Sequence, residues 1–482
     1  MHLLTLNSEM TKDNLPLKTK LAFGIGSTGE AATNWVFSGL VFFYYNQIIG
    51  LPGTLTGIGV FIAMMFDAIS DPLVGSISDR FKSKYGRRHP FMFFAPIPTS
   101  IALICIFYPP AAMSTFGLFT WFLFSTIFLR LSITMFTVPH LALGAELSDD
   151  YIERSKVMSF NNIFNYGGWV IMHIFVWIIV FPNYGGDKVG QLVRESYLPI
   201  ISFTVILVTV CILVSAIFTR DRIPLLKKPS SDLDEFNFKN LFLDIKGALS
   251  NKNYQNLLLG LLFLAVLIGT HETLSIYMAT FFWELSPIQI GYLVLNNIIG
   301  YGVGFAITAK LHDKFDKPLV IFVSVFVLTI FWSLPIILGL LGAAPQNSST
   351  ELVIFLISIY AIASASGSIL NISVMSALAD ITDEHELKTG KRQEGIFYAA
   401  RAFFSKASNG MGQVVAGLCL DIINFPRNAI PGEIPRETII ELGYIDGPFA
   451  MIWGFIALIF YKRYKINKAY HDEIKAGLIK KI

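Results

Sequence analysis

About twelve apolar stretches, each long enough to cross a lipid bilayer, follow one another along the 482 residues of this chain. A helix needs about 20 apolar residues to span a hydrocarbon core, and all of its backbone groups must be hydrogen-bonded internally there. The stretches are expected at 20–48, 54–78, 90–110, 114–146, 158–182, 196–219, 253–283, 287–310, 318–342, 352–378, 394–423 and 444–461. The chain is therefore predicted to be an all-α membrane protein with twelve transmembrane helices.

The basic residues indicate how these helices are oriented. Of the 37 Lys and Arg residues, 30 lie in the termini and alternate loops, four lie in the other loops, and three lie within spans. Basic loops remain on the cytoplasmic side, so both termini are expected in the cytoplasm, with the protein in the inner cell membrane. The net charge of +3 then reflects orientation, and nucleic acid is not an expected partner.

A polar segment at 220–252 separates six spans from the next six. We predict an N-terminal six-helix bundle at 1–219, a cytoplasmic linker at 220–252, and a C-terminal six-helix bundle with a basic tail at 253–482. Two such halves are the layout of major facilitator transporters, which bind substrate at the midplane. The second part of the linker has a helical pattern of apolar residues that is typical of a helix on the membrane surface: Phe236, Leu241, Phe242, Ile245 and Leu249.

Two aspartates one helical turn apart, Asp67 and Asp71, lie within the second apolar stretch. An ionised group at the bilayer centre costs roughly 2.5–3.5 kcal/mol, so such residues are usually functional or paired. The i,i+4 spacing places both carboxylates on one helix face, where they can hold one small cation or share a proton. Pro72 supports this, because it frees a backbone carbonyl nearby. The alternative is a structural pair that is satisfied by a buried cation such as Lys406.

Two long motifs occupy equivalent loops of the two halves. The first is DPLVGSISDRFKSKYGRRHP, which begins at Asp71, and the second is ADITDEHELKTGKRQEG at 379–395. Together they resemble motifs of the glycoside–pentoside–hexuronide:cation symporters, the melibiose permease group of the major facilitator superfamily. Sodium-dependent lysolipid symporters belong to the same wider group. The loop charges are expected either to form salt bridges between the halves or to be solvated residues that set the topology.

The resemblance implies a cation site around Asp67 and Asp71 that binds Na+ or exchanges H+. Ser70 stands where the permease has an asparagine, and Thr134 of the fourth span matches a hydroxyl ligand of the family. Thr137, at i+3 from Thr134, replaces a third family aspartate. The lost carboxylate implies weaker Na+ binding or a preference for H+.

The resemblance also implies residues that connect ion and solute. Lys406 of the eleventh span matches a family lysine that would pair with the aspartates when the cation is absent. Arg401 aligns with a substrate-side position and is expected to bind a carboxylate or phosphate, or else to extend to the cytoplasmic surface. Ala31, Asn162 and Asn371 stand where the permease has aspartate, arginine and tryptophan, respectively, so melibiose is not the expected solute.

The first, fourth and fifth spans provide a different polar lining. The predicted solute and coupling residues are Glu30, Asn34, Trp35, Arg130, Asn162, His271, Glu272, Asn371, Arg401 and Lys406. Trp35 would stack on a sugar ring, or else it is an ordinary interfacial tryptophan. His271 and Glu272 would bind substrate or relay protons, or else form a buried pair with Arg130 or Arg401. The charges expected in the interior of the spans are four acidic and three basic residues: Glu30, Asp67, Asp71 and Glu272, and Arg130, Arg401 and Lys406. The excess of one negative charge is what a site for a single cation requires.

We therefore expect a secondary active symporter that imports a sugar, glycoside or uronide with Na+ or H+ by alternating access. A cation-coupled lysolipid transporter and a non-transporting solute sensor are the alternatives. The sequence has no P-loop, nucleophile elbow or metal-ligand cluster, so no enzyme activity is expected. No cofactor is expected beyond the co-transported ion, and the protein is expected to be a monomer whose partners are the solute and membrane lipid.

Overall fold

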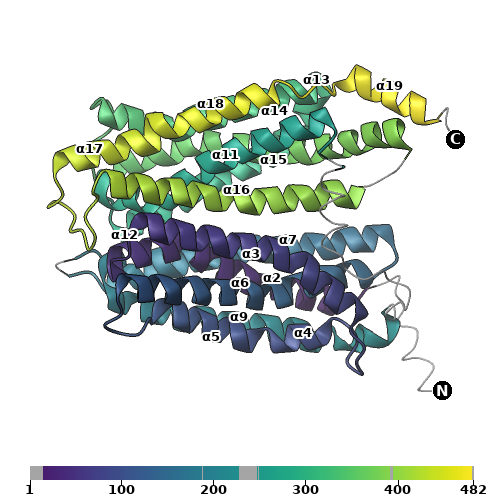
Figure 1. The fold of residues 1–482 in the computed structure, drawn as a ribbon, viewed down its shortest axis with the longest axis horizontal. Coiled ribbons are helices and arrows are strands. Elements are labelled where there is room, and N and C mark those ends of the chain that lie inside the picture. The colour runs from purple at the N-terminus through teal and green to yellow at the C-terminus, as the bar shows by residue number, and fades with distance from the viewer. Residues whose placement is uncertain (1–14, 187, 227–246, 248, 391–393, 480–482) are drawn as a thin grey trace. The chain divides into compact units, whose positions relative to one another are not determined.

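The computed structural model describes residues 15–186, 188–226, 247, 249–390 and 394–479, which form helices joined by short connections. Within these residues, twelve helical segments coincide with the twelve predicted stretches (Figure 1). Ten of them are long and apolar enough to cross a membrane. The first segment and the eleventh fall short because ionisable and small polar residues interrupt their apolar sequence. The protein has the predicted all-α, twelve-helix membrane fold.

Of the first six segments, three are continuous α-helices, one is interrupted at Ala95, and two are extended by π-helical turns. They are α2 (Leu17–Val36) with η1 (Phe37–Val41) and η2 (Tyr44–Ile49), α3 (Gly53–Arg80), α4 (His89–Phe94) with α5 (Pro96–Phe107), α6 (Thr115–Glu146), α7 (Tyr151–Ile174) with η3 (Phe175–Val180) and α8 (Phe181–Asn183), and α9 (Tyr197–Phe218). Short turns flank α9 at η4 (Gly190–Leu192), η5 (Arg194–Ser196) and η6 (Arg220–Leu225).

The last six segments follow the same plan, and a short polar helix follows them. They are α11 (Lys252–Tyr277) with η7 (Met278–Phe282), α12 (Pro287–Tyr292) with α13 (Val294–Lys314), α14 (Lys317–Leu340), α15 (Thr350–Thr389), α16 (Glu394–Ile422), and α17 (Arg436–Tyr444) with η8 (Ile445–Phe449) and α18 (Ala450–Tyr461). The C-terminal helix is α19 (Lys468–Ile479).

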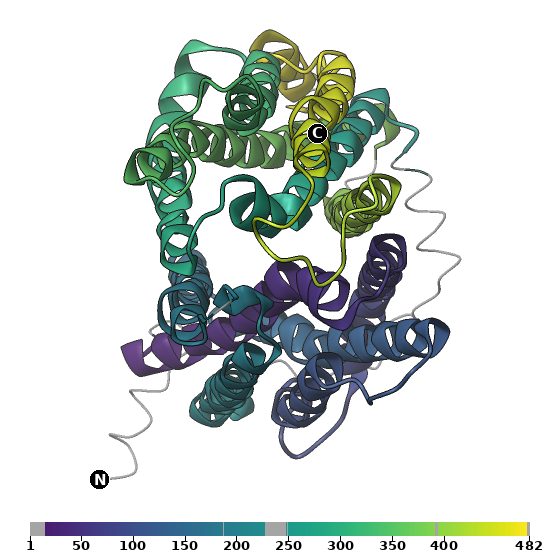
Figure 2. The ribbon, with the colours of Figure 1, turned by 90° about the vertical axis from the view of Figure 1, so that its left-hand side faces the viewer.

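The chain divides into two compact units, which comprise residues 1–51 with 62–236 and residues 52–61 with 237–482. The first turns of α3 thus belong to the second unit. The predicted amphipathic segment of the linker lies outside the described residues, apart from Leu249, which packs against the core of the second unit. Figure 2 views most helices of each unit close to end-on, so that the bundle arrangement within each unit is visible.

In the first unit, α2 packs against both α7 and α9. Small residues allow the close approach of α7, because a Cβ atom on Gly168 would lie only 2.8 Å from the Cβ atom of Ala31. Ala31 is fully buried in this contact. The position at which the resemblance would place a sugar-binding aspartate is therefore a helix-packing position in this protein.

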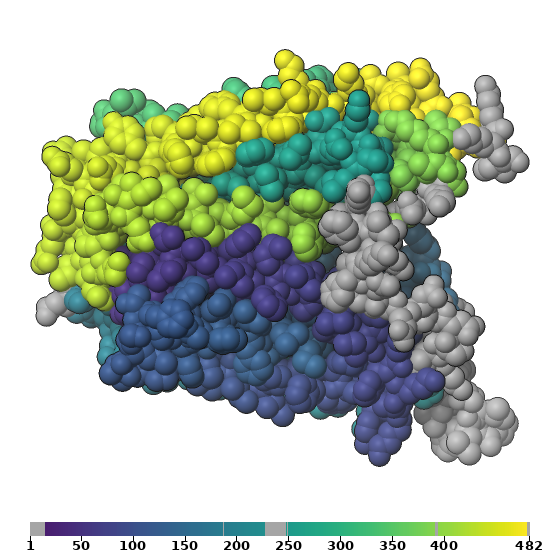
Figure 3. Space-filling view, viewed as in Figure 1, coloured from purple at the N-terminus to yellow at the C-terminus, as the bar shows by residue number. Residues whose placement is uncertain are grey.

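In the second unit, α11 packs between α16 and α18 (Figures 1 and 3). Gly269 and Gly412 meet where α11 crosses α16, and a Cβ atom on Gly412 would lie 2.6 Å from the Cα atom of Gly269. Tyr254, Phe397 and Tyr461 are buried in the apolar core around these helices. Tight glycine contacts and large aromatic side chains together fix the positions of α11 and α16.

Candidate cation and solute site

The side chains of Asp67 and Asp71 are joined by the hydroxyl group of Thr134. Thr134 Oγ1 lies 3.1 Å from Asp67 Oδ1 and 3.1 Å from Asp71 Oδ1. The two carboxylates share the face of α3 that meets α6, as their i,i+4 spacing predicts. Because a hydroxyl group has one proton, Thr134 donates to one carboxylate at a time and keeps its lone pairs. Three oxygen atoms from two helices thus meet in the first unit.

Arg130 forms an ion pair with Asp67, which the sequence analysis did not anticipate. Its Nη2 atom lies 2.5 Å from Asp67 Oδ2, and its Nη1 atom donates to Asn34 Oδ1 at 2.8 Å. The guanidinium also lies over the ring of Phe37, 5.2 Å from its centroid. Arg130 and Thr134 are one turn apart on α6, so the face that directs Thr134 toward α3 directs Arg130 there too. Arg130 therefore connects the aspartate on α3 to the amide on α2.

This cluster is largely enclosed. Asp67 and Thr134 are each only 1% exposed, and Arg130 is 9% exposed. Taking charges out of water is expensive, so their mutual pairing and hydrogen bonds are required for the buried arrangement to be stable. Ser70 is also buried, but its hydroxyl donates to the backbone carbonyl of Asp67 at 3.1 Å. Thr137 is half-buried and does not take part in the hydrogen bonds of this cluster.

The other predicted residues of the first unit are distributed over two helices. Glu30 is half-buried on α2, one turn before Asn34. Trp35 is buried, and its ring meets the ring of His173 edge-on at 6.0 Å. Asn162 is exposed on α7. Asn34 is joined to the aspartate cluster through Arg130.

Two predicted residues meet in the second unit. Arg401 of α16 donates from Nη2 to Asn371 Oδ1 of α15 at 3.3 Å. Lys406 is half-buried further along α16. A guanidinium beside an amide is a suitable pair of groups for an oxygen-rich solute.

His271 has a partner that the sequence analysis missed. Its Nδ1 atom lies 3.0 Å from Oδ1 of Asp446, in η8. One alternative in the sequence analysis paired His271 and Glu272 with Arg130 or Arg401, whereas the structure gives His271 the acidic partner Asp446. Glu272, the next residue on α11, is exposed. Asp446 could have been found, because it is an acidic residue within the predicted span 444–461.

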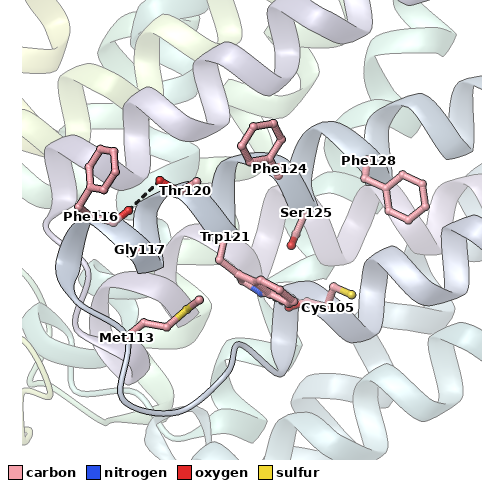
Figure 4. A pocket seen from close by; sticks show the side chains of 9 residues that line it. All are labelled: Cys105, Met113, Phe116, Gly117, Thr120, Trp121, Phe124, Ser125 and Phe128. Carbon is pink, nitrogen blue, oxygen red and sulfur yellow. Dashed lines mark hydrogen bonds between the residues drawn. The ribbon is translucent and has the colours of Figure 1, made fainter.

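A pocket of about 640 Å3 lies beside α6 and is lined by none of these charged residues (Figure 4). It is lined by Cys105, Met113, Phe116, Gly117, Thr120, Trp121, Phe124, Ser125 and Phe128. Phe116 and Phe124 are exposed, as apolar side chains on the lipid side of a membrane helix are expected to be. This pocket has no charged lining residue and does not belong to the candidate site.

Three known proteins are similar to this chain over most of its length. The uncharacterized symporter sll1374 of Synechocystis sp. is 26% identical over 98% of both chains. The sodium-dependent lysophosphatidylcholine symporter 1 of Gallus gallus is 20% identical over 97% of this chain and 90% of its own. The lactose permease of Leuconostoc lactis is 22% identical over 95% of this chain and 71% of its own.

The fold also has relatives among solved structures. The crystal structure of the nucleoside transporter NupG superposes with a TM-score of 0.60 at 12% identity, and covers 92% of this chain and 99% of that one. Residues 22–468 match the family model for MFS/sugar transport protein. The chain is therefore a member of the MFS/sugar transport protein family, whose members are membrane transporters rather than enzymes.

Proposed function

We propose that the protein is a cation-coupled symporter in which one Na+ or H+ binds at Asp67, Asp71 and Thr134. The observation that carries this proposal is the position of the Thr134 hydroxyl, 3.1 Å from an oxygen atom of each carboxylate. Hard cations are bound by oxygen ligands, and a carboxylate pair with a bridging hydroxyl supplies them inside a membrane. The names of two relatives, both symporters and one of them sodium-dependent, support the same function.

The two carboxylate oxygen atoms of Asp67 have different partners and, we propose, different roles. Its guanidinium contacts Oδ2, whereas Oδ1 faces Thr134. The cation would bind on the Oδ1 side, while Arg130 limits how much charge Asp67 offers it. Because Arg130 also contacts Asn34, a solute bound near Asn34 would shift the guanidinium and change the affinity for the cation. Linkage then requires that the cation changes the affinity for the solute by the same factor.

The bridging hydroxyl can be tested with the substitution Thr134→Val. This change keeps the shape of the side chain but removes the oxygen atom between the carboxylates, so we expect the apparent affinity for the coupling cation to fall about tenfold. Solute uptake into proteoliposomes would be measured against Na+ concentration and, separately, against pH.

The matched control is Thr126→Val on the same helix. Thr126 is fully buried and donates to backbone carbonyls of its own helix. Its substitution is expected to leave the ion dependence unchanged. Equal ion dependence in the Thr134 variant and the wild type would contradict the proposed cation site. A lower affinity in Thr137→Val would add that residue to the site, as the resemblance implies.

For the solute we propose a sugar, glycoside or uronide, which enters by alternating access. The family description and the lactose permease among the relatives support a sugar. Glu30 and Asn34 of the first unit, and Arg401 and Asn371 of the second, are the proposed contacts. The guanidinium of Arg401, already oriented toward the amide of Asn371, favours an acidic sugar.

The substitution Arg401→Gln tests this choice of solute. A hydrogen bond to a charged group contributes about 1.5–3 kcal/mol, so the loss is expected to weaken the uptake of a uronide at least tenfold. Uptake of the corresponding neutral sugar by the same variant is the control and should change little. An equal loss for both solutes would contradict the proposed contact with a carboxylate.

A lysolipid is the second candidate solute, favoured by the lysophosphatidylcholine symporter among the relatives. Its phosphate group would use the same cationic contacts as a uronide. Lysophosphatidylcholine should therefore be included in the solute panel, since its uptake in place of sugars would identify this function. Binding of a solute without flux would identify a sensor instead.

We propose that the termini lie in the cytoplasm, because 30 of the 37 basic residues lie in the termini and in alternate loops. A cysteine introduced at Lys475 of α19 should react with an impermeant maleimide in inside-out vesicles. Reaction in right-side-out vesicles would reverse the orientation.

A further inference from the structure

The carboxylate of Asp446 is enclosed within the second unit. Its exposed fraction is 0%, and its Oδ1 atom is hydrogen-bonded to Nδ1 of His271 at 3.0 Å. Its Oδ2 atom is buried and has no hydrogen-bond partner among the described residues. A buried polar atom without a partner is costly, and an ionised carboxylate within a membrane span is more so. Among the described residues, Oδ2 is thus a buried acceptor atom whose hydrogen-bonding capacity is unused.

Two aromatic rings lie beside the imidazole of His271 in this pair. The imidazole of His271 lies 4.7 Å from the ring of Trp332 on α14 and 5.9 Å from the ring of Tyr360 on α15. The neighbouring titratable groups are the phenol of Tyr360 and the carboxyl group of Glu272, which is exposed on α11. The pair itself comes from α11 and η8, and α14 and α15 supply the aromatic rings beside it.

We propose that His271 and Asp446 form a proton-binding site in the second unit that is distinct from the aspartate cluster on α3. An organic solute cannot reach a fully enclosed carboxylate. A metal cation would need several oxygen ligands, whereas the structure supplies one carboxylate and a ring nitrogen. A proton needs a single acceptor atom, and Oδ2 provides it.

The charge balance of this site is simple. With one proton on Nδ1 and an ionised carboxylate, the pair carries one negative charge. Uptake of one proton forms an O–H bond at Oδ2, and nothing is oxidised or reduced. The pair is then neutral overall, which avoids an uncompensated charge within the membrane. If the protein is the symporter proposed above, this proton is a coupling ion that enters and leaves through the second unit.

Difference infrared spectroscopy of the purified protein during a pH titration tests the site without any transport. The wild type is expected to show the carbonyl stretch of an enclosed, protonated carboxyl group. This band should disappear in Asp446→Asn. In His271→Gln it should remain but titrate at a different pH, because the partner atom has changed. The second variant keeps the test decisive if Asp446→Asn does not fold.

Two substitutions serve as matched controls. Asp383→Asn removes a partly exposed carboxylate that also contacts a histidine, His471, at 3.1 Å. His312→Gln removes a half-buried histidine that is bonded to Ser373 at 2.8 Å. Both should retain the band and its titration. A band that persists unchanged in Asp446→Asn, or one that does not respond to His271→Gln, would overturn the proposal.

Flux measurements then test the link to transport. In proteoliposomes, solute accumulation driven by a pH gradient is expected to fall about tenfold in Asp446→Asn, while exchange without a gradient stays within about twofold of the wild type. Unchanged accumulation would show that the proton at this site is not coupled to the solute. If the wild type transports nothing, the proposed function fails, whereas the infrared result still decides the proton site.

Discussion

Replacing Asp67 with asparagine is expected to abolish ion-stimulated uptake and to destabilise the purified protein. The change removes one carboxylate of the proposed cation site and leaves the guanidinium of Arg130 buried without its charge partner. Breaking a buried pair by removing one member typically costs about 3–5 kcal/mol. Uptake would be followed in proteoliposomes under separate Na+ and pH gradients. Stability would be followed as the apparent Tm at one fixed scan rate, because membrane proteins often unfold irreversibly.

Asp71→Asn is the informative comparison. It also removes a carboxylate that accepts from Thr134, so the ion dependence should be lost. The ion pair between Arg130 and Asp67 remains intact in this variant, and the fall in Tm should be clearly smaller. Ion dependence that survives in either variant would contradict the cation site.

The double variant Asp67→Asn with Arg130→Gln separates stability from coupling. Removing both charges eliminates the unpaired guanidinium, so most of the lost stability should return. Ion-stimulated uptake should not return, because the carboxylate is still missing. If the double variant recovered ion stimulation, Asp67 would be a partner of Arg130 rather than a cation ligand.

The membrane explains why the helices could be predicted from sequence. Backbone groups without hydrogen bonds are costly in hydrocarbon, and a helix satisfies all of them within one segment. An apolar stretch that is long enough to span the membrane is therefore expected to be helical. The predicted span 114–146, for example, corresponds to α6 at Thr115–Glu146. The fixed i,i+4 geometry likewise allowed the common face of Asp67 and Asp71 to be predicted.

Partners on different helices were harder to predict. Arg130 was considered as a solute contact, and the structure pairs it with Asp67. The prediction used the spacing within α3 but did not apply the same rule to Arg130 and Thr134 on α6. The partner of His271 depends on the axial register between α11 and η8, and helix periodicity contains no information about that register.

The environments of the charged loop residues were also hard to predict from the sequence. The loop charges were expected to form salt bridges between the halves or to be solvated. Lys82 and Lys84 are exposed, whereas Arg87 and Arg88 form salt bridges with acidic groups of their own unit. The sequence does not separate these residues, since all four are basic and lie within seven positions of one another. They differ in their surroundings, because Arg87 and Arg88 contact Glu146 at the end of α6, whereas Lys82 and Lys84 are exposed.

Replacing Arg88 with alanine is expected to cause a large loss of stability without directly altering ion binding. The Arg88 side chain is only 4% exposed and lies between acidic groups at the ends of two helices. Its Nη2 atom lies 2.9 Å from Glu146 Oε1 and also contacts Asp79, and its Nη1 atom donates to Ser78 at 2.6 Å. Substitution removes this buried donor from Ser78, Asp79 and Glu146, while Arg87 remains beside the two carboxylates. Breaking the buried pair should cost about 3–5 kcal/mol.

The control for this prediction is Lys82→Ala, which removes an equal charge from an exposed position in the same connection. Surface substitutions usually change stability by less than about 0.5 kcal/mol, so its apparent Tm should match that of the wild type. Arg88→Lys should not restore the stability, because one ammonium group cannot replace the planar fork that reaches Ser78, Asp79 and Glu146 together. A similar Tm for the Arg88 and Lys82 variants would mean that the motif acts through charge alone, as a signal for topology, and not through this buried network.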